Sequence, residues 1–159
     1  MSGTAAPPRF AADVMLGRLA RWLRVLGCDV AYGAHLHGMT LVRRARDEER
    51  VLLTRDSRLL RRVDPPPHVF VRSNLFREQV AQVVAAVPLG LVAPFSRCLD
   101  CNQPLEDVVP EHVAGRVPTD VAATQRRFQH CPRCHKVFWP GAHRARMERE
   151  VAAMGVADG

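Results

Sequence analysis

Long hydrophobic runs are absent from this sequence of 159 residues. The most apolar stretch, 83–93, is interrupted by Pro88 and Gly90. No segment therefore approaches the roughly 20 apolar residues of a membrane-spanning helix. The first eight residues, Met1–Pro8, lack the apolar core of a signal peptide. We expect a cytoplasmic protein with no membrane partner, in which residues 1–8 form a disordered leader.

Lysine is almost missing, since Lys136 is the only one in a chain with 23 lysine and arginine residues. The basic charge is therefore carried by arginine, and the formal net charge is +7 with a pI of about 10.1. The planar guanidinium group of arginine can bond two phosphate oxygens at once. The composition favours a nucleic-acid partner, and an acidic protein is the alternative.

Cysteines are few, but four of the five form two pairs with CxxC spacing, Cys98–Cys101 and Cys131–Cys134. In a chain without an export signal, this spacing indicates metal binding rather than disulfides. Two CxxC turns supply four thiolates, the tetrahedral ligand set of a structural zinc ion with no open position. The intervening segment, 102–130, would be an inserted loop or hairpin. The fifth cysteine, Cys28, is expected in the core.

Short apolar segments alternate with helical patterns through the first part of the chain, and Gly27 is expected to cap the first helix. This alternation predicts a mostly parallel sheet in an α/β domain. The expected strands are 10–12, 29–32, 51–54 and 68–71, and the expected helices are 15–26, 40–50, 56–62 and 75–87.

The alternation stops near Pro94. The following segment, 95–139, contains both cysteine pairs, several prolines and little periodicity, and 143–154 is again helical. We therefore expect an α/β domain over 9–94, followed over 95–155 by a zinc-binding module with a closing helix.

Two aspartates each follow an expected strand and precede a helix, namely Asp13 and Asp56. The carboxyl ends of parallel strands meet at one edge of the sheet, where ligands bind. Carboxylates that converge there can hold Mg²⁺ or Mn²⁺ for phosphodiester cleavage. Both residues are equally well placed as helix N-caps. Asp29 begins a strand and would either join this cluster or end a turn.

Three arginines recur at three-residue intervals on the first helix, Arg18, Arg21 and Arg24. They would follow a phosphate backbone beside Asp13, or simply form a solvated helix face. Trp22 on the same helix is expected to pack rather than to stack on a base.

The stretch 9–27, with the sequence RFAADVMLGRLARWLRVLG, resembles the opening of the Mut-7 C-terminal RNase domain, a PIN-like family. The segment VLLTRD at 51–56 is similar to its second signature. The two cysteine pairs, followed by FWPGAH at 138–143 and by Arg146-Met147, resemble its C-terminal zinc ribbon. The resemblance spans residues 9–150.

This resemblance implies a three-layer α/β/α nuclease fold of the PIN-like type, joined to a four-cysteine zinc ribbon. It implies metal-dependent RNA cleavage with Mg²⁺ or Mn²⁺ at Asp13 and Asp56, which match the acidic positions of the family, and Asp29 matches a further common aspartate. Relatives often carry acidic residues at the start of the second helix, where this chain has HLHGMT at 35–40. Asn74 stands where another acid could complete the site.

Three hypotheses follow for function. The first is a metal-dependent ribonuclease in which Asp13, Asp56 and Asp29 bind the cation, with RNA-binding residues Arg18, Arg21, Arg24 and Arg55. The second is a weakened or inactive PIN-like protein that binds RNA, with the ribosome or a tRNA as candidate targets. The third is a protein-interaction module whose basic surface meets an acidic partner. The sequence leaves the oligomeric state open.

Overall fold

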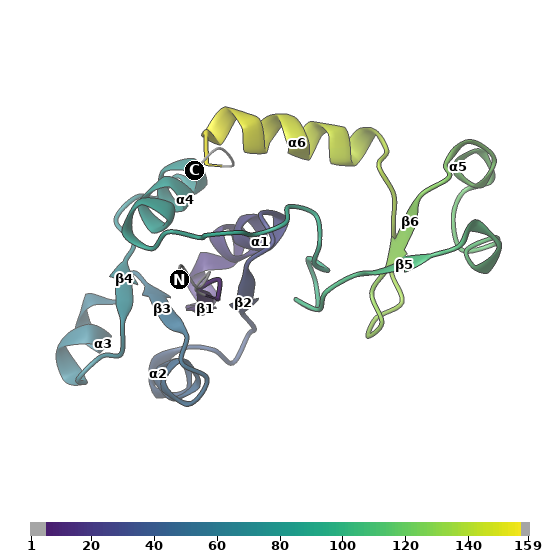
Figure 1. Ribbon diagram of the computed structural model, residues 1–159. Coiled ribbons are helices and arrows are strands. Elements are labelled where there is room, and N and C mark those ends of the chain that lie inside the picture. Colours follow the sequence, from purple (N-terminus) through teal and green to yellow (C-terminus); the bar gives the residue numbers. More distant parts are fainter. Residues whose placement is uncertain (1–5, 157–159) are drawn as a thin grey trace, which may run out of the picture.

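The computed structural model describes residues 6–156, so part of the expected leader, residues 1–5, lies outside the described residues. A four-stranded sheet forms the centre of the first part of the chain (Figure 1). Its order is β2-β1-β3-β4 and all neighbouring strands are parallel. The strands are β1 (Arg9–Ala12), β2 (Asp29–Ala31), β3 (Val51–Thr54) and β4 (His68–Phe70). The α/β prediction is confirmed.

Helices cover both faces of this sheet, because successive residues of each buried strand point to opposite sides. Phe10 and Ala12 face a core shared with α1 (Gly17–Val25) and α4 (Phe76–Ala86). Ala11, between them, faces a second core shared with α2 (Gly38–Asp47) and α3 (Ser57–Arg62). The result is the expected arrangement of three layers.

The first helix starts as a short 3-10 turn, η1 (Val14–Leu16), and ends in the way the sequence predicts. Gly27 has φ +97°, its N–H donates to Arg24 O, and the N–H of Cys28 donates to Leu23 O. This pair of bonds is a Schellman closure, in which a residue in the left-handed region satisfies the last carbonyl groups.

The second helix differs from its prediction at both ends. It begins before Thr40, at Gly38, after an extended His37. It ends at Asp47 because Glu49 takes a left-handed conformation with φ +53°. The N–H groups of Glu49 and Arg50 then donate to Arg46 O and Ala45 O, again as a Schellman closure. Arg50 therefore lies outside the helix and is buried beside β3.

The segment expected to form the zinc-binding module, called the zinc module below, is built on a second, antiparallel sheet of order β5-β6-β7. Its strands are β5 (Glu106–Val108), β6 (Phe128–His130) and β7 (Val137–Phe138). The segment between β5 and β6 contains η2 (Pro110–His112) and α5 (Thr119–Thr124), rather than the simple loop or hairpin expected from the sequence. This small sheet lies to one side of the parallel sheet (Figure 1).

The closing helix α6 (Ala142–Met154) returns to the first part of the chain. It lies on the same side of the parallel sheet as α1 and α4 (Figure 1). Met147 and Val151 belong to the same buried core as Leu19 of α1 and Val80 of α4. The bidentate contact of Arg77 with Glu150, with Nε 2.5 Å from Oε1, adds a link between α4 and α6. Among the helices described, none has the length and apolar character needed to cross a bilayer.

Candidate functional site

Asp13 and Thr54 meet at the carboxyl edge of the parallel sheet. Asp13 follows the last residue of β1, Thr54 is the last residue of the neighbouring β3, and the N–H of Asp13 donates to Leu53 O. Asp13 is 2% exposed, and Thr54 Oγ1 donates to its Oδ2 at 2.7 Å. The other oxygen, Asp13 Oδ1, is buried and has no hydrogen-bond partner among the described residues. A buried carboxylate oxygen without a partner carries a desolvation cost, which a bound cation would offset.

Asp56 lies next to Thr54 and is held by two hydrogen bonds. Its backbone N–H donates to Thr54 Oγ1 at 3.0 Å, and its Oδ1 accepts from the N–H of Leu59 at 3.0 Å. The second bond makes Asp56 the N-cap of α3. Asp13 makes no corresponding cap bond to its own helical turn. The two interpretations of these aspartates, helix N-cap and cation ligand, therefore apply differently. Capping accounts for the position of Asp56 but does not explain that of Asp13.

Thr54 connects the two aspartates, and we did not single it out from the sequence. Its hydroxyl accepts from the backbone of one aspartate and donates to the side chain of the other. The available signal was a polar residue that ends the apolar strand VLLT.

Asp29 lies at the opposite edge of the sheet. It pairs in register with Arg9 at the beginning of β1, whereas Asp13 follows the end of β1. Because parallel strands run in one direction, a residue that begins a strand cannot share an edge with residues that follow strand ends. The structure thus does not bring Asp29 together with Asp13 and Asp56.

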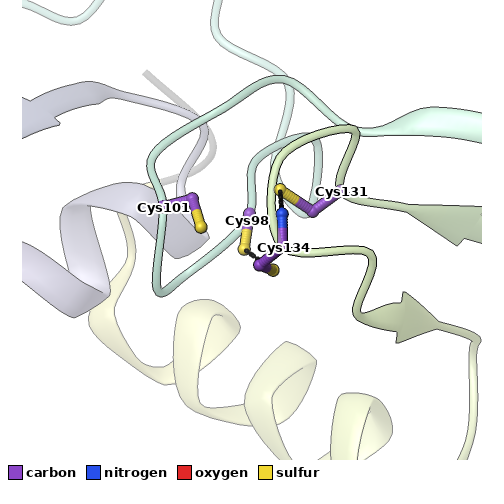
Figure 2. A group of neighbouring side chains, drawn as sticks. All are labelled: Cys98, Cys101, Cys131 and Cys134. Carbon is purple, nitrogen blue, oxygen red and sulfur yellow. Dashed lines mark hydrogen bonds between the residues drawn. The ribbon is translucent and has the colours of Figure 1, made fainter.

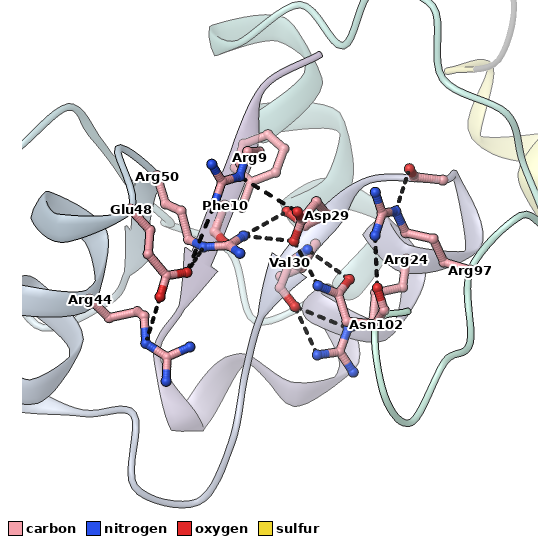
Figure 3. Close-up of polar contacts among 11 residues, drawn as sticks. Arg9, Phe10, Arg24, Asp29, Val30, Arg44, Glu48, Arg50, Arg97 and Asn102 are labelled. Carbon is pink, nitrogen blue, oxygen red and sulfur yellow. Dashed lines mark hydrogen bonds and ion pairs between the residues drawn. The ribbon is translucent and has the colours of Figure 1, made fainter. Parts of the chain in front are cut away.

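Arginine and asparagine side chains surround Asp29 instead (Figure 3). Arg50 Nη1 lies 2.7 Å from Asp29 Oδ1, Arg9 Nε lies 3.5 Å from Oδ2, and Asn102 Nδ2 donates to Oδ1 at 2.6 Å. Burial alone would raise the pKa of Asp29, but the hydrogen bonds from Arg50 and Asn102 lower it below its ordinary value. These contacts give Asp29 a structural role in the fold.

Arg55 and Asn74 meet near the carboxyl edge. The guanidinium group of Arg55 donates to Ser73 O at 3.1 Å and to Asn74 Oδ1. These bonds join the segments that follow β3 and β4. The resemblance placed Asn74 where an acid could complete the site, and here its side-chain oxygen is bonded to an arginine.

The three arginines of α1 do not share one face. Arg18 and Arg21 are exposed, and the Arg18 guanidinium lies over the Phe76 ring at 3.9 Å. Arg24 is 5% exposed, because two steps of three residues turn it about 120° around the helix axis from Arg18. Its guanidinium group donates to Val30 O at 2.8 Å (Figure 3) and also to Leu99 O at 2.8 Å. The expectation that Arg24 lies on the solvated face beside Arg18 and Arg21 is therefore not met.

All four paired cysteines converge at one point (Figure 2). Their sulfur atoms lie within 4.8 Å of one another, and Cys98 Sγ is 3.7 Å from Cys134 Sγ. Tetrahedral zinc with Zn–S bonds of about 2.3 Å requires sulfur atoms about 3.8 Å apart. The ligand set and its spacing therefore fit a structural zinc ion held by Cys98, Cys101, Cys131 and Cys134.

The N–H groups of Arg133 and Cys134 both point at Cys131 Sγ, each at 3.4 Å. Burial raises the pKa of this thiol, but these backbone N–H groups outweigh it and lower the pKa to about 7. Such N–H groups stabilise a thiolate ligand. By contrast, burial raises the pKa of Cys28 to about 12, in agreement with a core position.

The first cysteine pair is attached to the free edge of β2. Asn102 Oδ1 accepts from the N–H of Val30 at 3.0 Å, while Arg24 donates to Val30 O (Figure 3). Arg97 joins the same segment to the end of α1, because its guanidinium group donates to Gly27 O at 3.2 Å and to Asn102 O at 2.7 Å. These side chains satisfy backbone groups that an edge strand would otherwise expose. Sequence reasoning missed Asn102 and Arg97 in this role, because partners 70 or more positions apart leave no local pattern.

A family model described as the Mut7-C RNAse domain matches residues 8–151. No curated protein and no solved structure shows a significant match to the chain. The matched range contains both aspartates of the carboxyl edge and all four clustered cysteines. Because the match covers nearly the whole chain, the protein belongs to the Mut7-C RNAse domain family.

Proposed function

We propose that the protein is a metal-dependent ribonuclease of the PIN-like type, with Asp13 and Asp56 as the residues that hold the cation. The observation that carries this proposal is the buried Oδ1 of Asp13, which has no partner among the described residues at the carboxyl edge of a parallel sheet. A hard oxygen ligand of this kind fits Mg²⁺ or Mn²⁺. Membership of an RNase domain family supports RNA as the substrate.

The residues at the carboxyl edge would have different roles in this function. Thr54 holds Oδ2 of Asp13, and Oδ1 has no hydrogen-bond partner among the described residues. Asp56 is fixed by its cap bond to Leu59, which leaves its second carboxylate oxygen available. When bound, a divalent cation would supply positive charge to the phosphate and activate the attacking water. Arg18, exposed near the start of α1, would contact a neighbouring phosphate.

The test is Asp13→Asn, which keeps the size of the side chain and its hydrogen bond with Thr54 but removes the charge. We expect the variant to lose cleavage of single-stranded RNA with little change in melting temperature. Asp47→Asn removes an exposed carboxylate of α2 and serves as the matched control. Cleavage should depend on added Mg²⁺ or Mn²⁺, and should stop in a chelator that leaves the zinc bound. Equal cleavage rates for Asp13→Asn and the unaltered protein would contradict the assignment.

A second candidate function is RNA binding without cleavage. It is favoured by the start of α2, where HLHGMT at 35–40 contains no carboxylate and His37 is the N-cap. If the protein does cleave RNA, the small number of carboxylates should hold the cation weakly. Cleavage activity should then be low, and Mn²⁺ should support it better than Mg²⁺, which loses its water reluctantly. Tight RNA binding with no cleavage at any concentration of either metal would favour this second function.

A further inference from the structure

A pocket lies where α1, β7 and α6 meet, away from the two aspartates of the carboxyl edge. Its volume is about 420 Å³, within the roughly 300–1,000 Å³ of small-ligand sites. The walls are mainly apolar and include Phe95, Leu99, Phe138 and Met147. The function proposed above makes no use of this pocket.

Two aromatic side chains in the wall have cations beside their rings. The Arg144 guanidinium lies 4.6 Å from the centre of the Phe95 ring, and Lys136 Nζ lies 5.8 Å from that of Phe138. Phe138 is half-buried and lines the pocket. A flat aromatic ligand could stack on it, and such stacking on nucleobases tolerates any base sequence.

The charge of the lining has one sign. Arg21, Arg97, Lys136 and Arg144 line the pocket, and the lining includes no aspartate or glutamate. Lys136 and Arg144 each contact a carboxylate outside the lining, Asp100 and Glu148. Arg21 is exposed and makes no ion pair with any residue in the described range 6–156. The pocket thus suits a ligand with a flat apolar part and an attached anion.

A second hollow of about 310 Å³ adjoins this pocket near the start of α1, and its lining includes the ion pair of Arg77 with Glu150. The two share His143 and Met147, and the second is lined by Arg18 and Phe76. Arg18 and Arg21 are successive exposed positions of α1, which begins just after Asp13. The arginine side chains of α1 therefore lead from the start of the helix, just after Asp13, to the pocket.

We propose that this pocket takes an unpaired base of single-stranded RNA, with Phe138 as the stacking surface and Arg21 in contact with the adjoining phosphate. The inference rests on the proposed function in that RNA is the substrate. It adds that the strand binds between the four-cysteine module and α1, in a pocket whose lining includes neither Asp13 nor Asp56. The pocket would then select single strands over duplex, because paired bases cannot enter it.

The test measures binding in an Asp13→Asn background, so that no cleavage disturbs the equilibrium. The probes are fluorescein-labelled oligouridine and an RNA duplex of equal length, followed by anisotropy over a range of salt concentrations. Phe138→Ala should weaken single-strand binding on the order of 5- to 150-fold and leave the salt slope unchanged, since no phosphate contact is lost. Arg21→Ala should reduce that slope by about 0.7. Neither change should matter as much for the duplex.

Two conservative variants separate stacking from packing. Phe138→Tyr retains an aromatic ring and should bind as the parent does, whereas Phe138→Leu retains apolar volume and should bind as weakly as Phe138→Ala. Arg43→Ala is the charge control, because Arg43 is exposed on α2, on the opposite face of the sheet. One zinc per chain in each variant would show that the ribbon is folded. Should Phe138→Ala lose its zinc, the leucine and tyrosine variants carry the test.

The outcomes distinguish this proposal from the proposed function. Undiminished single-strand binding by Phe138→Leu would overturn the base pocket and assign the cavity to apolar contact with a protein segment. Equal losses for single strand and duplex would also overturn it. In both cases the parent still binds RNA, and the proposed function stands. If the parent binds neither probe, both proposals fail together.

Discussion

Thr54 shows how one hydroxyl group can organise a site. It is fully buried, and it is bonded both to the Asp13 side chain and to the Asp56 backbone. The hydroxyl has one proton and two lone pairs, so it can donate to one aspartate while it accepts from the other. Thr54 is therefore a positioning residue in the proposed mechanism.

Thr54→Val keeps the shape of the side chain but removes both bonds. We expect it to lower the free energy of unfolding by about 1–3 kcal/mol, because Asp13 Oδ2 is left buried without a donor. Cleavage should fall, since Asp13 is no longer held in one orientation. Thr54→Ser keeps the hydroxyl and should restore most of the activity. Thermal melts and initial cleavage rates measure the two effects, and a fully active Thr54→Val protein would exclude the positioning role.

Asp29 should make stability depend on acid pH. Its pKa in the folded protein is held below the ordinary value of about 3.9 by hydrogen bonds from Arg50 and Asn102, against the effect of burial. The ionised carboxylate thus stabilises the fold at pH above about 4, and this stabilisation is lost as pH falls through the folded pKa.

Asp29→Asn tests this dependence. Near pH 7 the free energy of unfolding of the variant should be about 2 kcal/mol lower, because two arginines lose an ionised partner. The difference from the unaltered protein should shrink as pH falls below about 4. Urea melts at several pH values measure this difference, with Asp47→Asn as the control because Asp47 is exposed on α2. A difference that is constant from pH 7 to pH 3 would mean that the charge of Asp29 contributes nothing.

At the scale of single elements, the end of α1 is the most constrained point. Gly27 has φ +97°, and a Cβ placed there would lie 2.3 Å from Ala93 O. The backbone of 93–95 packs tightly here, since the N–H of Phe95 donates to Val25 O at 2.8 Å. The connection between the α/β part and the zinc module therefore passes directly over this helix end.

Gly27→Ala should destabilise the protein by more than the roughly 1–2 kcal/mol of a left-handed alanine, because the clash with Ala93 adds to it. Gly90→Ala is the matched control, since Gly90 also has a positive φ, +67°, but has open space around it. Melting temperatures of the two variants give the comparison. Equal losses would show that the chain at 93–95 can move aside without cost.

At the scale of the whole molecule, the zinc module is joined to the α/β part at two places. Asn102 and Arg97 attach the first cysteine pair to the β2 edge and the α1 end, and α6 returns to the core of α1 and α4. Loss of the metal should therefore loosen the module first and leave most of the sheet intact, because the two buried clusters against the sheet contain no zinc ligand.

Cys131→Ser should lose the zinc and with it the order of the segment between Phe95 and α6. Elemental analysis should find one zinc per chain in the unaltered protein and none in the variant. Hydrogen exchange should show faster exchange in β5 to β7, with the amides of β1 and β3 still protected. Protein purified without chelator that contains no zinc would contradict the four-cysteine site.

Much of the fold was predictable because its signals are local. Apolar alternation gave the four strands of the parallel sheet to within a residue or so, and Gly27 ended the first helix as its lack of a side chain predicted. The second helix was placed too late because its end depends on Glu49, a residue type that rarely takes a positive φ. The strands of the zinc module are too short to leave a periodic pattern.

The fold class and the four metal-binding cysteines could be predicted without the structure, since both follow from local spacing and periodicity. Which charged residues share a surface depends instead on how the helices and strands pack. Strand direction sent Asp29 to the edge opposite Asp13, and helix rotation buried Arg24 beneath the zinc module. The partnerless oxygen of Asp13 and the pocket beside Phe138 were likewise decided by packing. Each depends on contacts between segments far apart in the chain, and such contacts follow from how the elements pack rather than from any local pattern.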